Sequence, residues 1–312
     1  MRRTSPADST ATIVTNPQSR PTVRVGPSRI PPVRRRGRNV PAAIAVGTLI
    51  LLVLGGVIGP LFLPDPAVQQ LSSALQPPAW MAGGSPEHLL GTDHLGRDEL
   101  ARAAVGIRTS LLTSVVATLV GGAFGVLVGM IAGFYRGWVD EVIMRISDIQ
   151  MSIPNILLVL TIVTVLRPSL ASIIFVLALS AWVLFARVAR AETLSLRERD
   201  VVLAARGLGA NDMRILLRHL LPNISGPLLV IATFEIATLI IAESSLGYLG
   251  LGVPPPTPTL GAMISAGQEG LTAGVWWPVV VPGVVIAAFI MSVNVLGDWM
   301  RDRLDPHEKT RR

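Results

Sequence analysis

The chain has 312 residues, of which 50% are hydrophobic and only 15% are charged, whereas about 25% of residues are charged in soluble domains. It contains no cysteine, which excludes a disulfide scaffold, thiolate metal sites and a cysteine nucleophile. The formal net charge is +7, but Lys309 is the only lysine, so the chain lacks the glycine-rich loop followed by lysine that binds ATP phosphates.

The N-terminal part of the chain changes character near residue 40. Residues 1–40 are rich in proline, serine and arginine without an apolar period, which predicts a disordered tail. The apolar stretch Ala43–Leu63 is longer than the core of a signal peptide, and no small-residue cleavage site follows it. We therefore interpret residues 41–108 as an uncleaved transmembrane helix and an external loop.

Further apolar stretches have the length that a membrane span requires, about 20 helical residues for a hydrocarbon core about 30 Å thick. They are Thr109–Gly133, Ile149–Leu166, Pro168–Ala186, Ile224–Ala242 and Val279–Gly297. The sequence therefore predicts an all-α, polytopic membrane protein with about six transmembrane helices. Residues 109–300 would hold five of them, with a tight hairpin at Arg167 and Pro168, and residues 301–312 would form a second tail.

The basic residues predict the orientation of these spans. With six spans both termini share one side, and that side carries all but four of the 27 arginine and lysine residues. Because cytoplasmic segments retain basic residues, both termini and the loop at residues 191–222 are expected in the cytoplasm. This topology accounts for the positive charge, so we do not expect a nucleic-acid partner.

The external segments contain polar and aromatic groups with more than one interpretation. One histidine and two carboxylates make a poor transition-metal site, so we expect local Asp–Arg hydrogen bonds to hold the cluster Asp93, His94, Arg97 and Asp98. The pair Trp276–Trp277 either anchors the chain at the membrane interface or contacts an external protein.

The second span carries a glycine at every fourth position. These glycines are Gly121, Gly125, Gly129 and Gly133. Small residues in register allow close approach of two helices in lipid, so the stripe predicts a helix-packing face.

The loop at residues 191–222 has the pattern of two short helices. Val201, Val202, Ala205 and Leu208 form an apolar stripe, and Gly209 can end that helix in a left-handed conformation. Asn211 can cap a second helix, which Pro222 is expected to end. We expect a knob that inserts into a cytoplasmic partner through Asp200, Val201, Val202, Leu203, Ala204, Ala205, Arg206, Leu208 and Gly209.

Two carboxylates lie in or beside the fifth span. A charged group near mid-bilayer is costly and usually faces a cavity or a partner. Glu235 and Glu243 are about 80° apart around a helix, hence broadly on one side. Either both line a path through the membrane and meet a cationic group, or Glu243 lies at the outer interface and Glu235 pairs within a subunit contact.

The loop resembles the EAA loop of bacterial ABC-importer permeases. Matching residues with the same spacing are Ala204, Ala205, Gly209, Leu221 and Pro222. Leu203 replaces the glutamate of that motif and His219 its isoleucine, which removes one possible hydrogen bond at the docking surface. Three further stretches resemble the second permease type of the oligopeptide, dipeptide and nickel branch, namely Gly91–Asp98, Glu243–Pro258 and Asn294–Pro306.

The resemblance implies a type I importer fold in the bacterial inner membrane and no catalysis or cofactor in this chain. It implies a second permease, two ATP-binding subunits that hold ATP and magnesium, an extracytoplasmic substrate-binding protein, surrounding lipid, and peptides as cargo. Nickel or another small solute is an alternative cargo, and an ion channel or sensor is an alternative class. An intramembrane serine protease is not expected, because all four histidines lie outside the spans.

Overall fold

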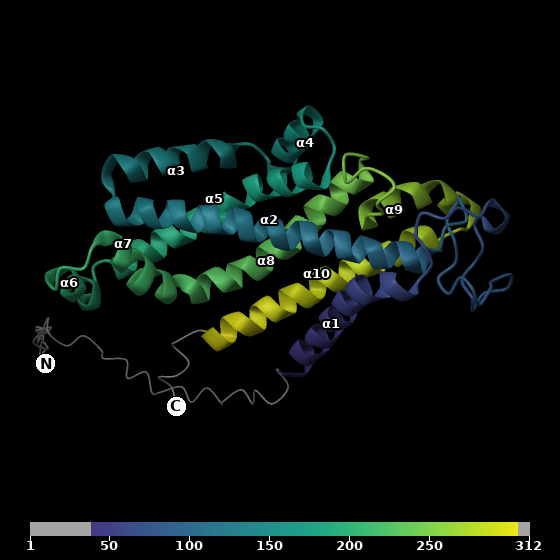
Figure 1. Cartoon of the computed structure of the whole chain (residues 1–312), viewed down its shortest axis with the longest axis horizontal. Coiled ribbons are helices and arrows are strands. Elements are labelled where there is room, and N and C mark those ends of the chain that lie inside the picture. Colours follow the sequence, from purple (N-terminus) through teal and green to yellow (C-terminus); the bar gives the residue numbers. More distant parts are fainter. Residues whose placement is uncertain (1–38, 305–312) are drawn as a thin grey trace, which may run out of the picture. The chain divides into compact units, whose positions relative to one another are not determined.

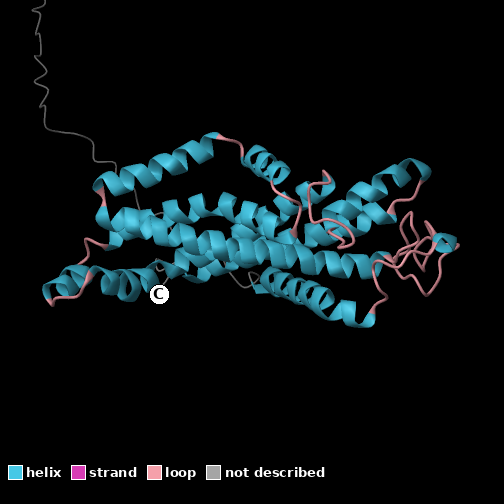
Figure 2. Cartoon of the chain, turned by 45° about the horizontal axis from the view of Figure 1, so that its top comes forward, coloured by secondary structure: helices cyan, strands magenta, loops and turns pink. Residues whose placement is uncertain are grey.

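The computed structural model describes residues 39–304, and within them helices and loops make up the chain without a β-strand (Figures 1 and 2). Five helices are long and apolar enough to cross a membrane, or six if a bent pair counts as one span. This confirms the predicted all-α polytopic fold. The predicted tails lie outside the described residues, apart from residues 39–40 and 301–304.

Each long helix extends beyond its predicted apolar stretch at one end or at both ends. They are α1 (Asn39–Phe62), α2 (Glu99–Tyr135), α5 (Leu170–Leu196), α8 (Leu221–Tyr248) and α10 (Trp277–Leu304). The early start of α2 has a local cause, because the Asp98 carboxylate accepts a hydrogen bond from the Ala101 N–H at 2.8 Å and caps the helix. The shorter elements are η1 (Leu71–Ser73), α3 (Gly137–Ser152), α4 (Asn155–Val165), α6 (Asp200–Gly207), α7 (Asp212–Arg214), η2 (Ile215–Leu220), α9 (Leu260–Gly267) and η3 (Gln268–Ala273).

The glycine stripe of α2 packs directly on the backbone of α5, as predicted. A Cβ atom added at any of its four glycines would overlap a carbonyl oxygen of α5, from Ala178, Trp182, Ala186 and Arg190 in turn. Both series advance by four residues in the same direction, so the two helices run parallel. The chain between them must therefore return from one end of the pair to the other, and α3 runs back beside them (Figure 1).

The returning segment is not the single straight span predicted at Ile149–Leu166. Helices α3 and α4 meet at an angle of 90°, because Ile153 and Pro154 adopt extended backbone conformations between them. Proline lacks the N–H that would continue α3 and restricts the residue before it. The predicted hairpin between α4 and α5 is present, and Val159 and Val163 of α4 pack in one buried cluster with Ile173 of α5.

The prediction that Pro222 ends a helix is wrong. Helix α7 continues without interruption through the π-helical turn η2 into α8, and Pro222 lies in the first turn of α8. In the π-helical turn the Leu221 N–H donates to the Leu216 carbonyl, five residues back. This wider turn reduces the conflict between the proline ring and the preceding turn of an α-helix.

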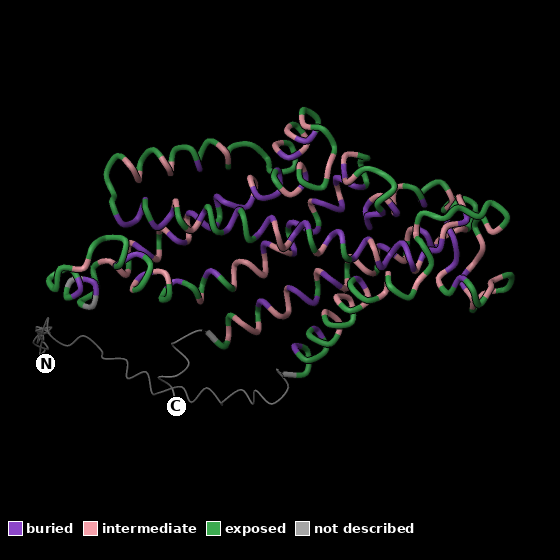
Figure 3. Tube along the Cα trace, viewed as in Figure 1, coloured by how far each residue is buried: buried purple, intermediate pink, exposed green. Residues whose placement is uncertain are grey.

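Burial follows the central helices. Buried positions concentrate on α2, α5 and α8, whereas α1 is exposed along much of its length (Figure 3). The exposed side chains of α1 include Leu51, Leu61 and Phe62, which are apolar. Such a surface suits lipid or another membrane subunit.

Candidate functional site

The loop between α5 and α8 forms the two-helix knob that its sequence predicts. Gly209 follows α6 with a φ of +82°, the left-handed conformation expected of it. The Asn211 side chain accepts a hydrogen bond from the Arg214 N–H at 3.0 Å and caps α7. Both predicted caps are thus confirmed, although the second helix continues into α8.

One face of the knob is built into the protein. Val202 and Ala205 of α6 are buried, and Val202 belongs to an apolar cluster with Phe134 of α2 and Ile215 of η2. The structure does not describe the side chains of Val201 and Leu203.

The opposite face of the knob is open and mixes apolar with basic groups. Asp200, Ala204 and Gly209 are exposed, and Leu208 has 90% of its surface exposed. Arg206 is also exposed, but its guanidinium lies over the Phe134 ring, on the side of Val202. Four further exposed side chains adjoin this face from α7 and η2, namely Met213, Arg214, Leu217 and Arg218. The four-residue spacing of Met213 and Leu217 is typical of one helix face, and this sequence signal could have identified both residues.

Contacts at its base tie the knob to the end of α2. The Arg197 guanidinium donates hydrogen bonds to the Phe134 carbonyl at 2.5 Å and the Gly133 carbonyl at 3.3 Å. These carbonyls lie in the last turn of α2, where a cation also favours the helix dipole. In addition, the Arg206 guanidinium lies 5.3 Å from the centre of the Phe134 ring. The role of Arg197 could not be predicted from local sequence, because its partners lie more than 60 residues away along the chain.

A second candidate site is a cavity at the break between α3 and α4. Its volume is about 310 Å³, and α3, α4, α5 and α8 line it. Glu235 on α8 lines this cavity, and its side chain has no hydrogen bond or ion pair within the described residues. Only 7% of its surface is exposed. The polar residues around the cavity are Gln150, Asn155, Ser180, Arg187, Glu235 and Thr238.

Glu243 occupies a different environment from Glu235. It is fully buried and accepts a hydrogen bond at 2.7 Å from the Ser110 hydroxyl of α2. It does not line the Glu235 cavity. The two carboxylates therefore share a helix but not a site.

The polar cluster in the external loop is held by local hydrogen bonds, as predicted. The Asp93 carboxylate accepts from the backbone N–H groups of Leu95 and Arg97, each at 2.9 Å, and from the Arg97 side chain at 2.7 Å. Asp98 pairs with the ring of His88 at 2.9 Å while it caps α2. The cluster thus fixes the loop against the start of α2.

Trp277 fastens the start of α10 to the same loop. Its indole N–H donates to the Thr92 carbonyl at 2.9 Å, and its side chain is almost fully buried. This role differs from both alternatives considered for the tryptophan pair, because a buried, bonded ring faces neither lipid nor an external partner. Trp276 packs edge-on against Trp277.

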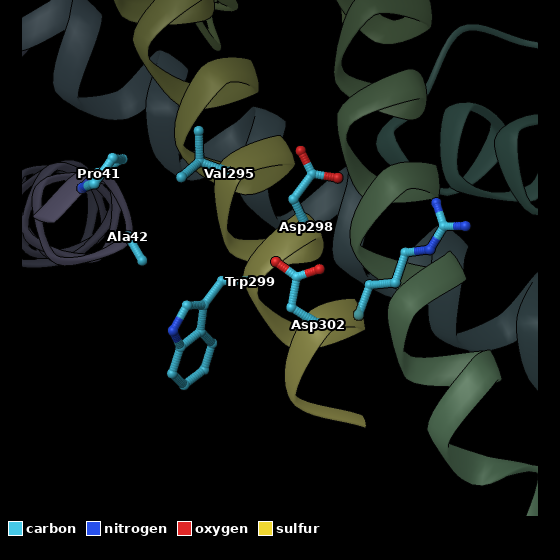
Figure 4. A pocket seen from close by; sticks show the side chains of 7 residues that line it. Pro41, Ala42, Val295, Asp298, Trp299 and Asp302 are labelled. Atoms are coloured by element: carbon cyan, nitrogen blue, oxygen red, sulfur yellow. The ribbon is translucent and has the colours of Figure 1, made fainter. Parts of the chain in front are cut away.

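A separate groove of about 460 Å³ lies between α1 and α10 (Figure 4). Trp299 and Val295 of α10 project toward Pro41 and Ala42 of α1, and the carboxylate of Asp298 lies on the other side of α10 (Figure 4). These elements do not contribute to the Glu235 cavity. The groove is therefore distinct from the second candidate site.

Comparison with known proteins gives a family and close relatives. Residues 125–310 match the model of the family described as "Binding-protein-dependent transport system inner membrane component". The chain is 38% identical to a dipeptide transport system permease protein of Haemophilus influenzae, over 87% of this chain and 92% of the relative. It is 37% identical to a di/tripeptide permease protein of Pseudomonas aeruginosa, over 84% of this chain and 86% of the relative. An oligopeptide permease protein of Bacillus subtilis is also 37% identical, over 86% of each chain.

The fold has a counterpart among solved structures. A chain of the MetNI methionine ABC transporter, described in inward-facing conformations, superposes with a TM-score of 0.53 at 23% sequence identity. The match covers 64% of this chain and 94% of that chain. This likeness supports the type I importer permease fold expected from the sequence.

Proposed function

The chain belongs to the family of binding-protein-dependent transport system inner membrane components, and we propose that it is a permease subunit of an ATP-driven peptide importer. The names of its relatives support di- or oligopeptides as cargo. Its apolar helices and its family support a multi-pass protein of the inner membrane. The positive charge of both tails supports cytoplasmic termini.

The proposed assembly contains a second permease, two ATP-binding subunits and an external substrate-binding protein. ATP and magnesium would bind to the ATP-binding subunits, and this chain would carry out no covalent chemistry. Its task is then to exchange between two conformations, one favoured by ATP on the cytoplasmic side and one by the loaded binding protein outside.

The observation that carries this proposal is the exposed tip of the knob. Leu208 is a large apolar side chain with 90% of its surface exposed, on a knob whose other face is buried in the protein. Docking on an ATP-binding subunit would cover it, together with Ala204 and Gly209. A displacement of the knob would be transmitted to α2 through the hydrogen bonds of Arg197. Because α2 packs tightly on α5, both helices would then move together.

Substitutions on the exposed face of the knob test this function. We expect Ala204→Glu and Gly209→Pro to reduce co-purification of the ATP-binding subunits and to abolish ATP-dependent uptake of a labelled dipeptide. Ala205 is unsuitable because it is buried. Ser195→Glu, at an exposed position of α5, is the matched control. Retained subunits and normal uptake in Ala204→Glu would contradict the proposal, and ion current without ATP would favour a channel.

For the path of the cargo we propose the cavity that contains Glu235. Its carboxylate lines a cavity near the middle of α8, a helix that is long and apolar enough to cross a membrane. The hydrogen bond of Glu243 with Ser110 supports a packing role for that second carboxylate. The alternative, in which Glu235 meets a second subunit, predicts that Glu235→Gln weakens assembly rather than uptake.

A further inference from the structure

The cavity at the α3–α4 break contains a carboxylate that has no hydrogen-bond or ion-pair partner among residues 39–304. Glu235 lies near the midpoint of α8, and its surroundings bury most of the side chain. The only guanidinium in the lining, Arg187, already donates to the Ser147 hydroxyl at 3.0 Å and pairs with Asp148. Ionisable groups inside a membrane face a cavity or pair with another polar group. Glu235 faces a cavity, which therefore offers a place for a positive group of a ligand.

The same cavity also contains a positive pole, the start of helix α4. Helix α4 begins here, and both Pro154 and Asn155 line the cavity. No side chain caps α4, and the backbone N–H groups of Asn155 and Ile156 donate no hydrogen bond within the described residues. An uncapped helix N-terminus carries about half a positive charge and binds carboxylates.

We propose that this cavity binds a short zwitterionic peptide, with its ammonium group on Glu235 and its carboxylate at the N-terminus of α4. This inference deepens the proposed function and rests on it. A volume of about 310 Å³ lies at the lower end of the roughly 300–1,000 Å³ of small-molecule sites, which suits a peptide of few residues. Discontinuous helices near the bilayer midplane are used in this way by membrane transporters.

The other residues that line the cavity favour a peptide over a bare metal ion as the ligand. Ser180 and Thr238 donate to backbone carbonyls of their own helices and keep acceptor capacity for peptide N–H groups. Apolar side chains such as Leu158 and Val183 complete the wall. The lining contains one carboxylate and no histidine, a poor ligand set for nickel. An organic ammonium group therefore fits better than a divalent cation.

The first experiment tests the ammonium subsite by direct binding. The complete importer, without its external binding protein, is placed in nanodiscs and titrated with radiolabelled Ala-Phe and with N-acetyl-Ala-Phe. We expect the unmodified dipeptide to bind at least tenfold more tightly than the acetylated one, since a charge-assisted hydrogen bond is lost. Glu235→Gln should remove this preference, whereas Glu243→Gln, a carboxylate of the same helix outside the cavity, should keep it.

The second experiment tests the carboxylate subsite with two substitutions at one position. Asn155→Ala removes the side chain and keeps the N–H, whereas Asn155→Pro also removes the N–H. Proline suits the first turn of a helix, and Pro154 already has a ψ of 127°, which the residue before a proline requires. We expect Asn155→Pro to bind Ala-Phe several-fold more weakly than Asn155→Ala does, with no such difference for the amide Ala-Phe-NH₂.

The results of these experiments separate the proposed binding site from the proposed peptide cargo. If the wild-type importer takes up Ala-Phe with ATP and binding protein, but acetylation and Glu235→Gln leave nanodisc binding unchanged, the zwitterion site is refuted and the importer function stands. If the wild-type importer takes up no dipeptide at all, the proposed cargo itself is refuted.

Discussion

Adding one methyl group at Gly129 should force α2 and α5 apart. The Cβ of Gly129→Ala would overlap the backbone carbonyl of Ala186, an atom that cannot rotate away as a side chain can. A Cβ added at Gly133 would lie 2.8 Å from the Arg190 carbonyl oxygen, whereas ordinary van der Waals contact of a Cβ begins at about 3.4 Å. The overlap at Gly129 is larger, so the helices must separate at that crossing.

The expected loss of stability is the difference between an overpacking penalty and a gain in helix propensity. Overpacking a well-packed interior by a methylene costs about 1–3 kcal/mol, and a rigid backbone neighbour favours the upper half of that range. Replacing glycine by alanine inside a helix returns about 1 kcal/mol of helix propensity. We therefore expect Gly129→Ala to lower the free energy of unfolding by about 1–2 kcal/mol.

A second glycine supplies the matched control. Among the described residues, no atom beyond the adjoining backbone of α10 lies within 4 Å of a Cβ added at Gly283, so Gly283→Ala should gain up to about 1 kcal/mol. The free energies of both variants can be measured by SDS-induced unfolding in mixed micelles, followed by circular dichroism. Equal stability of Gly129→Ala and Gly283→Ala would show that the close backbone contact is not what holds α2 on α5.

Three further predictions concern the knob and the external loop. Arg197→Ala removes the hydrogen bonds to the last carbonyls of α2, so we expect reconstituted importers to keep ATPase activity and lose at least half of their uptake, whereas Arg199→Ala should keep both. Leu208→Asp should leave the melting temperature of the isolated subunit unchanged, because the side chain is exposed, yet reduce retention of ATP-binding subunits in pull-downs. Trp277→Phe removes the hydrogen bond that fastens the external loop, worth about 1 kcal/mol, and limited proteolysis should cut that loop faster than in Trp276→Phe.

Local sequence patterns predicted the features that depend on neighbours along the chain. The four glycines of α2 share one face because their spacing of four nearly matches the helical repeat. Gly209 and Asn211 occupy their predicted capping positions because each acts on residues within one turn. The Asp93 cluster is likewise local, since its side-chain hydrogen bonds and ion pairs connect residues no more than ten positions apart, the longest joining Asp98 to His88.

The Glu235 cavity could not be predicted in this way. Its walls come from α3, α4, α5 and α8, and no spacing in the sequence brings these elements together. The eight-residue separation of Glu235 and Glu243 predicted that both carboxylates lie broadly on one side of a helix. The different surroundings depend on other helices, because Ser110 of α2 covers Glu243 while the α3–α4 break leaves a cavity beside Glu235.

Two prolines show why helix breaks are the least predictable part of such a chain. Pro154 follows a helix end and leaves a bend of 90°, whereas Pro222 lies in a helix that continues through it. The proline ring creates the same steric conflict at both positions. The outcome differs because the turn before Pro222 can widen into a π-helix, with a hydrogen bond from Leu221 to Leu216, whereas Ile153 bonds only three residues back to Gln150 and then extends. The break at Pro154 also leaves the N-terminus of α4 uncapped in the cavity that Glu235 lines. The bend that the predicted straight span at Ile149–Leu166 lacked therefore also creates the candidate binding site.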